Sequence, residues 1–291
     1  MDDSLHSRLG LSVPYEWWPS AATLKEIEAA GFRWVQAPTP PASVLIDPRG
    51  SARHAGSLAA ALGTTGLRRI LHGPGSLQVG TPQGDRAMEG LLAYAAEAGA
   101  AYVVYHAANF PDRPSSEDRL LAETRSLAHA ASLAERLGVT IAIENLAPVF
   151  PGPNALSFTP SVLRTMANRI GSPALGLCLD VGHANVVAGL RRTDPLRLIE
   201  PVLDRTVLFH LHDNLGGRWS GESPPELDPL RLDLHLPPGR GSIPWARLAP
   251  FLDRAPEAPL LLEVHPPRPS AAALHERALE QLGQAAERVA A

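Results

Sequence analysis

The sequence contains little cysteine, no long apolar run and no large excess of charge. The single cysteine, Cys178, excludes an intramolecular disulfide and a zinc site built from cysteines alone, and it favours a reducing location. No stretch approaches the ~18 consecutive apolar residues of a membrane span. The acidic start at Met1-Asp2-Asp3-Ser4 has no apolar segment after it, so a secretory signal is not expected. We therefore expect a cytoplasmic protein without a membrane partner.

Heptad repeats, low-complexity blocks and long linkers are also absent, so we expect a single domain over residues 1–291. The apolar fraction of 45% is typical of a globular protein and too high for disorder. A formal net charge of -4 argues against a surface that binds nucleic acid everywhere, although a local basic groove stays open. Eleven histidines beside thirty aspartates and glutamates make a metal site with nitrogen and oxygen ligands the first chemistry to examine.

Short apolar runs recur along the chain, and helical patterns lie between them. Parallel strands that are covered by helices on both faces are apolar almost throughout, as these runs are. Eight strand–helix units in one chain predict a single closed (β/α)8 TIM barrel. The alternative, a doubly wound open sheet, usually carries a glycine-rich loop after its first strand, where this sequence has Pro14-Tyr15-Glu16-Trp17-Trp18. The expected strands are Leu9–Val13, Phe32–Ala37, Leu67–His72, Ala101–His106, Val139–Glu144, Leu175–Asp180, Thr206–His212 and Pro259–Val264.

Polar side chains stand at or near the carboxyl ends of six of these strands. In a barrel these ends surround one opening, where the active sites of this architecture lie. Carboxylates and imidazoles bind Zn, Mn, Mg or Fe, and carboxylates that converge without a cation would repel one another. Any one of them alone is more often a structural histidine or a solvated carboxylate, but the repetition favours a metal site. The residues are His72, His106, Glu144, Asp180 with His183, His210 with His212, and Glu263 with His265, while Asp233 and His235 precede the last strand.

These candidates differ in strength. His212 has the strand phase of His210 but lies further past the strand, so we favour contact with substrate over metal ligation. Asp213 is expected to orient His210 through the second ring nitrogen, and Cys178 is expected in the barrel core. The strongest ligand candidates are Glu144, Asp180, His210 and Glu263. The further ligand candidates are His72, His106, His183, Asp233 and His235.

Four motifs at these positions resemble those of the xylose isomerase-like barrel superfamily, and the resemblance covers roughly residues 9 to 285. This superfamily contains divalent-metal sugar isomerases and epimerases. It also contains apurinic-site DNA repair enzymes of the endonuclease IV type, the AP endonuclease family 2. The motifs are specific for the superfamily and not for one activity inside it. They are Glu144-Asn145-Leu146, the run Leu-Asp-Val-Gly-His-Ala-Asn from Leu179, His-Leu-His-Asp-Asn from His210, and Leu261-Leu262-Glu263.

The resemblance to the isomerase and epimerase branch implies a single divalent ion, which would be Mn, Zn, Mg or Co. His210 is preferred to His212 as a ligand because the metal-binding histidine of this branch usually stands three residues before an acidic residue, here Asp213. The choice between the two histidines stays open. By the resemblance, the ligands of this ion are Glu144, Asp180, His210 and Glu263.

The same branch implies an enediolate mechanism on a sugar, sugar phosphate or cyclitol, within carbohydrate metabolism. Glu144 and Glu263 would give and take the proton as general acid and base. Barrels of this type often pair, which leaves a homodimer open. The residues expected to bind substrate are His183, His212, Trp17, Trp18, Trp219 and Arg240.

Resemblance to the endonuclease branch implies up to three zinc ions and a phosphodiesterase activity. The remaining ligands of that branch match His72, His106, His183, Asp233 and His235. However, the mouth loops contain few Lys or Arg residues, and phosphate contacts dominate DNA affinity, so a nucleic-acid partner is the weaker alternative. A third alternative is a non-catalytic barrel that binds a ligand or a partner subunit, which would leave so many ligand-type residues without a role.

Overall fold

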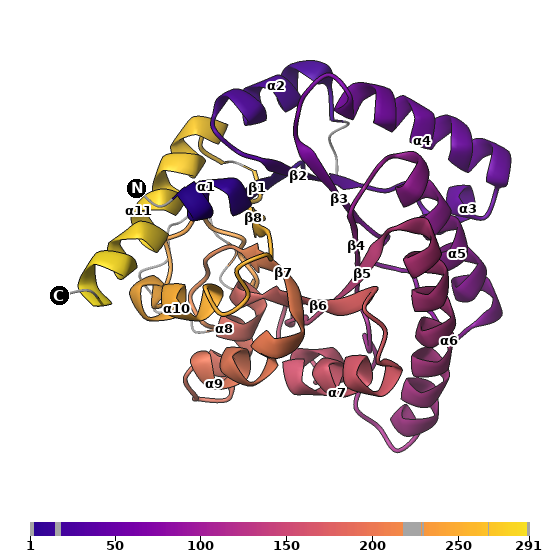
Figure 1. The fold of residues 1–291 in the computed structure, drawn as a ribbon. Coiled ribbons are helices and arrows are strands. Elements are labelled where there is room, and N and C mark those ends of the chain that lie inside the picture. The colour runs from indigo at the N-terminus through magenta and orange to yellow at the C-terminus, as the bar shows by residue number, and fades with distance from the viewer. Residues whose placement is uncertain (1–2, 15–18, 218–227, 229, 267, 290–291) are drawn as a thin grey trace.

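Eight parallel strands close into a barrel in which each strand pairs with the next in sequence and β1 pairs with β8 (Figure 1). This computed structural model describes residues 3–14, 19–217, 228, 230–266 and 268–289. The predicted (β/α)8 TIM barrel is confirmed, and the open doubly wound sheet is wrong. The strands are β1 (Leu9–Ser12), β2 (Trp34–Pro38), β3 (Arg68–His72), β4 (Tyr102–Tyr105), β5 (Thr140–Glu144), β6 (Leu175–Asp180), β7 (Thr206–Leu211) and β8 (Leu260–Leu262).

Helices surround the strands and cover the outer face of the barrel (Figure 1). The helix α1 (Asp3–Arg8) precedes the first strand, and short 3-10 turns cover Leu156–Phe158 and Glu200–Arg205. Among the described residues, no helix combines the length and the apolar character needed to cross a membrane. The other helices are α2 (Ala21–Ala29), α3 (Ala42–Leu45), α4 (Pro48–Leu62), α5 (Pro82–Glu97), α6 (Ser116–Leu137), α7 (Pro160–Ile170), α8 (Val181–Leu190), α9 (Leu196–Ile199), α10 (Trp245–Leu252) and α11 (Ala271–Val289).

Local sequence signals fix several helix ends. The helix α6 ends at Gly138, which adopts a left-handed φ of 68°, a conformation that glycine enters without steric cost. The helix α7 begins with Pro160, whose fixed φ suits the first helical position. The helix α8 begins directly after β6, and the Asp180 side chain accepts a hydrogen bond from the His183 N–H as its N-cap. A candidate ligand therefore also starts the helix that carries His183.

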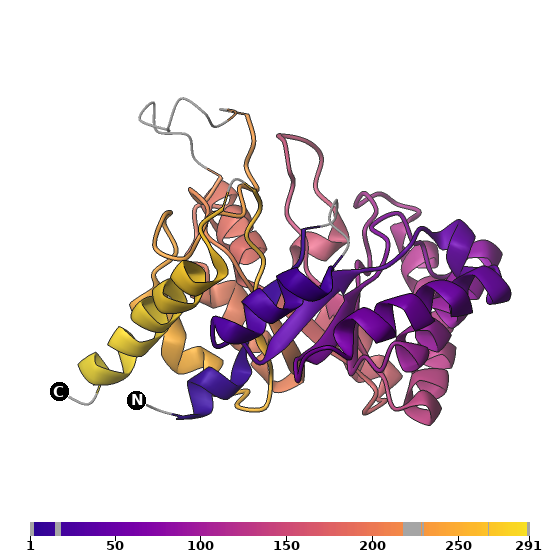
Figure 2. The same cartoon turned by 90° about the horizontal axis from the view of Figure 1, so that it is seen from above.

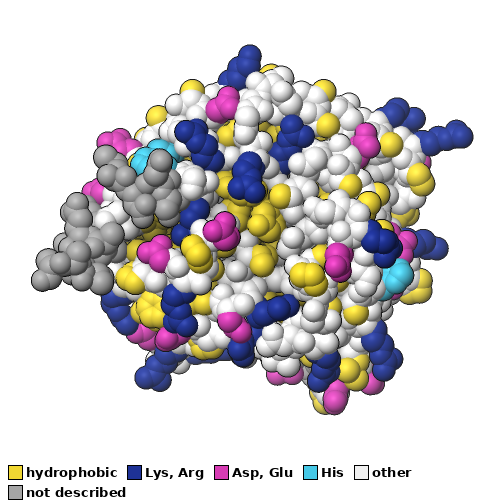
Figure 3. All heavy atoms as spheres, viewed as in Figure 1, with side chains coloured by type: hydrophobic (Ala, Val, Ile, Leu, Met, Phe, Trp, Pro, Cys, Tyr) yellow, Lys and Arg dark blue, Asp and Glu magenta, His cyan; other side chains and the backbone are white. Residues whose placement is uncertain are grey.

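A layer of apolar side chains fills the inside of the barrel below its mouth. Cys178 is one of them and is fully buried, as expected. At one end of this layer Arg68 covers the ring of Trp34 at 3.8 Å. On the outer surface, acidic and basic side chains are mixed with one another over the face seen in Figure 3. The layer consists of Trp34, Ile70, Val104, Ala142, Cys178, Leu208 and Leu261.

The loops after the strands build the mouth of the barrel. In Figure 2 the loop after β5 and the described part of the segment between β7 and α10 project from the same end of the barrel, away from the chain's N-terminus. A hydrogen bond from the Leu232 N–H to the Val149 carbonyl joins these two segments. The strands β4 and β8 end at Tyr105 and Leu262, earlier than expected, so two candidate site residues stand just beyond their strands rather than in them.

Candidate metal centre

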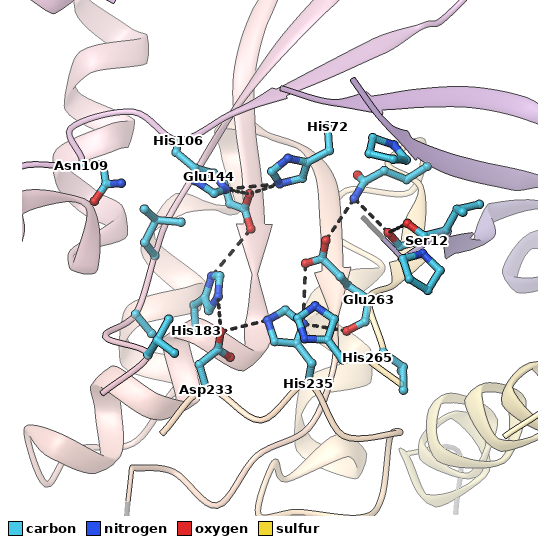
Figure 4. A pocket seen from close by; sticks show the side chains of 18 of the residues that line it. Ser12, His72, His106, Asn109, Glu144, His183, Asp233, His235, Glu263 and His265 are labelled. Carbon is cyan, nitrogen blue, oxygen red and sulfur yellow. Dashed lines mark hydrogen bonds and ion pairs between the residues drawn. The ribbon is translucent and has the colours of Figure 1, made fainter. Parts of the chain in front are cut away.

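A cavity of about 430 Å³ opens at the mouth, and acidic and histidine side chains form its floor (Figure 4). The labelled side chains reach this floor from many different strand ends. Its walls are mainly apolar and come from the loops after β1, β2, β5 and β8. The apolar wall residues are Val13, Pro14, Pro38, Leu146, Ala147, Val149, Phe158 and Val264.

The centre of the floor is a group of three carboxylates around His210. Their ligand atoms lie within 4.8 Å of one another. Nδ1 of His210 lies 3.0 Å from Oε1 of Glu144, 3.3 Å from Oε2 of Glu263 and 3.8 Å from Oδ2 of Asp180. Nε2 of the same ring donates to Oε1 of Gln36 at 2.9 Å, so Nδ1 carries the lone pair. A lone pair that faces three carboxylates is repulsive unless a proton or a cation lies between them.

An outer group shares Glu144 with the centre. Nε2 of His72 and Nε2 of His106 lie 3.2 Å apart, and both approach Oε2 of Glu144, at 3.4 and 3.2 Å. Nδ1 of His72 donates to the carbonyl of Gly73 at 2.8 Å, which leaves the lone pair on Nε2. These three side chains together can hold one ion.

A third group combines His183 on α8 with Asp233 and His235 from the segment between β7 and α10. Nε2 of His183 and Nε2 of His235 face Oδ2 of Asp233 at 3.4 and 2.9 Å. Both rings donate from Nδ1 to a backbone carbonyl, of Asn145 and of Glu263 respectively, at 2.8 Å. The histidine Nε2 atoms are therefore free to bind a metal, in the manner of ligating imidazoles that are fixed by a hydrogen bond at the other nitrogen.

Three oxygen atoms of the site are buried without a hydrogen-bond partner: Oε2 of Glu144, Oδ2 of Asp180 and Oδ1 of Asp233. An unpaired buried charge is costly, and a divalent cation bound by these oxygens would remove the cost. Nitrogen and carboxylate donors of this kind suit Zn, Mn or Fe, so the residues present fit a divalent ion.

Without a cation, protons on the histidines must balance the carboxylates. Burial favours the uncharged form of Glu144, but His210, His106 and His72 outweigh it and hold the pKa of that carboxyl well below its usual range. Burial likewise opposes protonation of His183 and His210, yet neighbouring charged and hydrogen-bonding groups raise the pKa of both well above its usual value. For His235, Asp233 raises the pKa to about 9. A bound metal would displace these protons.

Several expected residues occupy other positions. His212 is fully buried, lies outside the cavity lining, and stacks on His235 with the ring centroids 3.8 Å apart. The structure does not bring it to the substrate cavity; instead its Nε2 lies 3.1 Å from Oδ1 of Asp180 and 3.8 Å from Oδ1 of Asp233, so it can join His183, Asp233 and His235 as a metal ligand. Arg240 is exposed and also lies outside the lining. Trp17, Trp18 and Trp219 lie outside the described residues.

The expected contact between Asp213 and His210 is absent. The Asp213 carboxylate instead accepts hydrogen bonds from the N–H groups of Gly239 and Ile243 and from the indole of Trp245. Gln36 orients His210, and it also donates to Glu263 at 3.1 Å. The sequence signal for Gln36 was available, because it is the one polar residue of the otherwise apolar strand β2.

The comparisons agree with this architecture. A family model described as xylose isomerase-like TIM barrel matches residues 24–285. The uncharacterized protein MJ1311 of Methanocaldococcus jannaschii is 32% identical over 94 residues, a match that spans only 31% of this chain and 29% of that protein.

Solved structures share the whole fold at low sequence identity. A D-tagatose 3-epimerase-like protein superposes with a TM-score of 0.73 at 20% identity, over 97% of this chain and 99% of that chain. An L-ribulose 3-epimerase gives a TM-score of 0.68 at 15% identity, over 97% and 96% of the two chains. At these identities the structures show the fold alone. Because the family model covers most of the barrel, the chain belongs to the xylose isomerase-like TIM barrel family.

Proposed function

We propose that this protein is a divalent-metal-dependent isomerase or epimerase of a sugar or cyclitol, acting through an enediolate. The observation that carries the proposal is the central group, in which Glu144 and Glu263 approach His210 from strands that are not neighbours in the barrel. The names of the two epimerase-type structures above support this class of reaction.

The side chains of the centre have different roles in the proposed reaction. A bound divalent ion would supply a Lewis acid that lowers the energy of the enediolate. Glu144 and Glu263 hold carboxylates on two sides of the substrate position, so one removes the proton beside the carbonyl and the other returns it. His183 lines the same cavity and is fixed by the Asn145 carbonyl, so it can orient a hydroxyl group.

The cavity favours an uncharged polyhydroxylated substrate. Its described lining contains no Lys or Arg residue that could pair with a phosphate. The apolar wall of Leu146, Ala147 and Phe158 suits the C–H face of a sugar ring, and the volume of about 430 Å³ lies in the ordinary range for small-molecule sites.

Solvent deuterium exchange tests the proposal. The metal-loaded protein should incorporate deuterium at the carbon next to the carbonyl of an accepted ketose, and Glu144→Gln and Glu263→Gln should each reduce this exchange by at least about 100-fold. Glu257→Gln changes an exposed glutamate on the same fold and should leave exchange unchanged. Wild-type exchange rates in both site variants would overturn the assignment.

A second candidate function is a trinuclear zinc phosphodiesterase. The specific observation in its favour is that Glu144 belongs to both the central and the outer group, while Nδ1 of His183 in the third group lies 3.7 Å from Oε1 of Glu144. Four carboxylates carry four negative charges, so one divalent ion leaves the floor negative whereas three ions leave it positive and attractive to phosphate. Three zinc ions per chain together with cleavage of abasic duplex DNA would support this candidate. One ion per chain and no cleavage would support the sugar isomerase or epimerase.

A further inference from the structure

We propose that Glu123 is a positioning residue for the outer group, where it keeps His106 in the orientation that completes the pair with His72. Glu123 lies on α6, outside the barrel, and touches none of the candidate ligands. The inference rests on the proposed metal centre and requires an ion in the outer group beside the ion of the central group; with both ions present, it does not depend on which reaction that centre catalyses.

His106 differs from four other histidines of the three groups in how its ring is held, whereas His212 has no hydrogen bond to a described residue on either ring nitrogen. The rings of His72, His183, His210 and His235 are each fixed by a hydrogen bond from the nitrogen that does not face the other ligands. Within the described part of the chain, Nδ1 of His106 has no such partner. The direction of its Nε2 toward Glu144 is therefore set by the backbone that carries it.

That backbone is held by Glu123. Both oxygens of its carboxylate accept a hydrogen bond from the N–H of Ala108, at 3.2 and 3.0 Å. Ala108 has a φ of 51°, a left-handed conformation that a residue with a Cβ adopts only when its surroundings hold it. Tyr105, which directly precedes His106, donates its hydroxyl to Oε1 of Glu123 at 2.5 Å. Through these contacts with Tyr105 and Ala108, Glu123 holds the backbone in place on both sides of His106.

Through Tyr105 and Ala108, the same carboxylate is also connected to the loops that follow β3 and β5. The Tyr105 hydroxyl accepts the N–H of Val79, in the loop that leads away from His72. The carbonyl of Ala108 accepts the N–H of Ser157, in the loop that follows Glu144. Glu123 is 1% exposed, so water does not compete for these contacts. Its hydrogen bonds connect the loops that carry or follow all three residues of the outer group.

Zinc retention at a fixed free zinc concentration tests the inference. At a concentration that just saturates the wild-type protein, Glu123→Gln should retain one ion fewer per chain. Raising free zinc by about 10- to 100-fold should restore that ion, because this is the usual loss of affinity when a group that orients a ligand is removed. His106→Asn should lose the same ion, and the double variant should lose no second one.

The matched control is Glu117→Gln, on the exposed side of the same helix, which should keep the wild-type zinc content. If Glu123→Gln does not fold, Tyr105→Phe removes only the hydroxyl link and should weaken the same ion to a smaller extent. Full zinc content in a folded Glu123→Gln, equal weakening of all bound ions, or a wild-type protein with no ion on His72 and His106 would overturn the inference. A protein that loses this ion but never exchanges deuterium would refute the proposed reaction and leave the role of Glu123 intact.

Discussion

At the scale of single residues, the two nitrogens of His210 have separate partners. Oε1 of Gln36 accepts a hydrogen bond from Nε2, and carboxylates surround Nδ1. The amide group of Gln36 also donates to Glu263, so one side chain on β2 fixes two candidate ligands from β7 and from the end of β8. A glutamine suits this place because it offers a donor and an acceptor without adding charge.

Gln36→Leu should therefore weaken metal binding at the central group by about 10- to 100-fold, because His210 loses the hydrogen bond that fixes its ring. Competition with a chromophoric chelator measures the affinity. Gln78→Leu makes the same change at an exposed position and serves as the control. Equal affinities of the two variants would show that Gln36 does not orient His210.

The metal-free protein should lose stability as the pH rises above neutrality. The folded-state pKa of His235 is about 9 because Asp233 outweighs the effect of burial, whereas its unfolded value is about 6.5. The protonated ring thus contributes its full stabilisation below pH 6.5, and this contribution is lost as the pH rises through about 9. The shift corresponds to about 3 kcal/mol.

Urea unfolding of chelator-treated protein at pH 6.5 and pH 9.5 measures this effect. His183 and His210 shift in the same direction and should add to the loss. The zinc-loaded protein should lack this dependence, because its ligating histidines are already neutral. A metal-free protein that is more stable at pH 9.5 than at pH 6.5 would contradict the assignment.

Much of the candidate site could be read from the sequence because its residues follow strand ends. Glu144, Asp180 and His210 belong to strands whose apolar runs set their register, so their convergence follows from barrel closure alone. Gln36 was missed although its polarity within an apolar strand marks it, and Glu123 was missed because its role depends on side-chain contacts across the fold. His212 is two residues after His210, so its side chain points to the same side of the strand and is buried as expected. Its stacking on His235 could not be predicted from the sequence.

At the scale of elements, Asp213 fastens the segment between β7 and α10. Its carboxylate accepts the N–H groups of Asn214, Gly239 and Ile243 and the indole N–H of Trp245, and it is fully buried. The backbone of Asp213 also pairs with Leu236 in both directions, at 2.7 and 2.8 Å. These bonds hold in place the stretch that presents Asp233 and His235.

Asp213→Ala should lower the free energy of unfolding by about 3 kcal/mol, because it leaves several buried N–H donors without an acceptor. Urea denaturation gives the value. Asp228→Ala removes an exposed carboxylate from the same mouth segment and should change stability by less than about 0.5 kcal/mol. A similar small effect for Asp213→Ala would show that the network does not stabilise the segment.

The strands themselves were predictable because each is an apolar run of barrel length, and Leu175–Asp180 has the predicted ends. The ends of β4 and β8 were placed too late. After β4 the chain turns through the left-handed Ala108, which the carboxylate of Glu123 stabilises from another element. A turn of that kind depends on a contact distant in sequence, so periodicity cannot locate it.

At the scale of the whole molecule, the centre couples metal binding to barrel stability. The ligands of its three groups come from the ends of β3 to β8 and from the segment before β8. An ion that binds only the folded state at 1,000 times its dissociation constant stabilises that state by about 4 kcal/mol.

Treatment with a strong chelator should therefore lower the melting temperature by about 10 °C, and adding zinc or manganese back should restore it. Scanning calorimetry measures the change, and the variant Asp180→Asn should show a smaller response. A melting temperature that does not respond to chelator or to added metal would contradict a metal site whose ligands come from several strands of the barrel.

The most direct test of the account is anomalous scattering from crystals of the protein grown with zinc or manganese. We expect an anomalous peak at bonding distance, about 2.0–2.2 Å, from Glu144, Asp180, Glu263 and Nδ1 of His210. Metal-saturated crystals without a peak between these four side chains would contradict it.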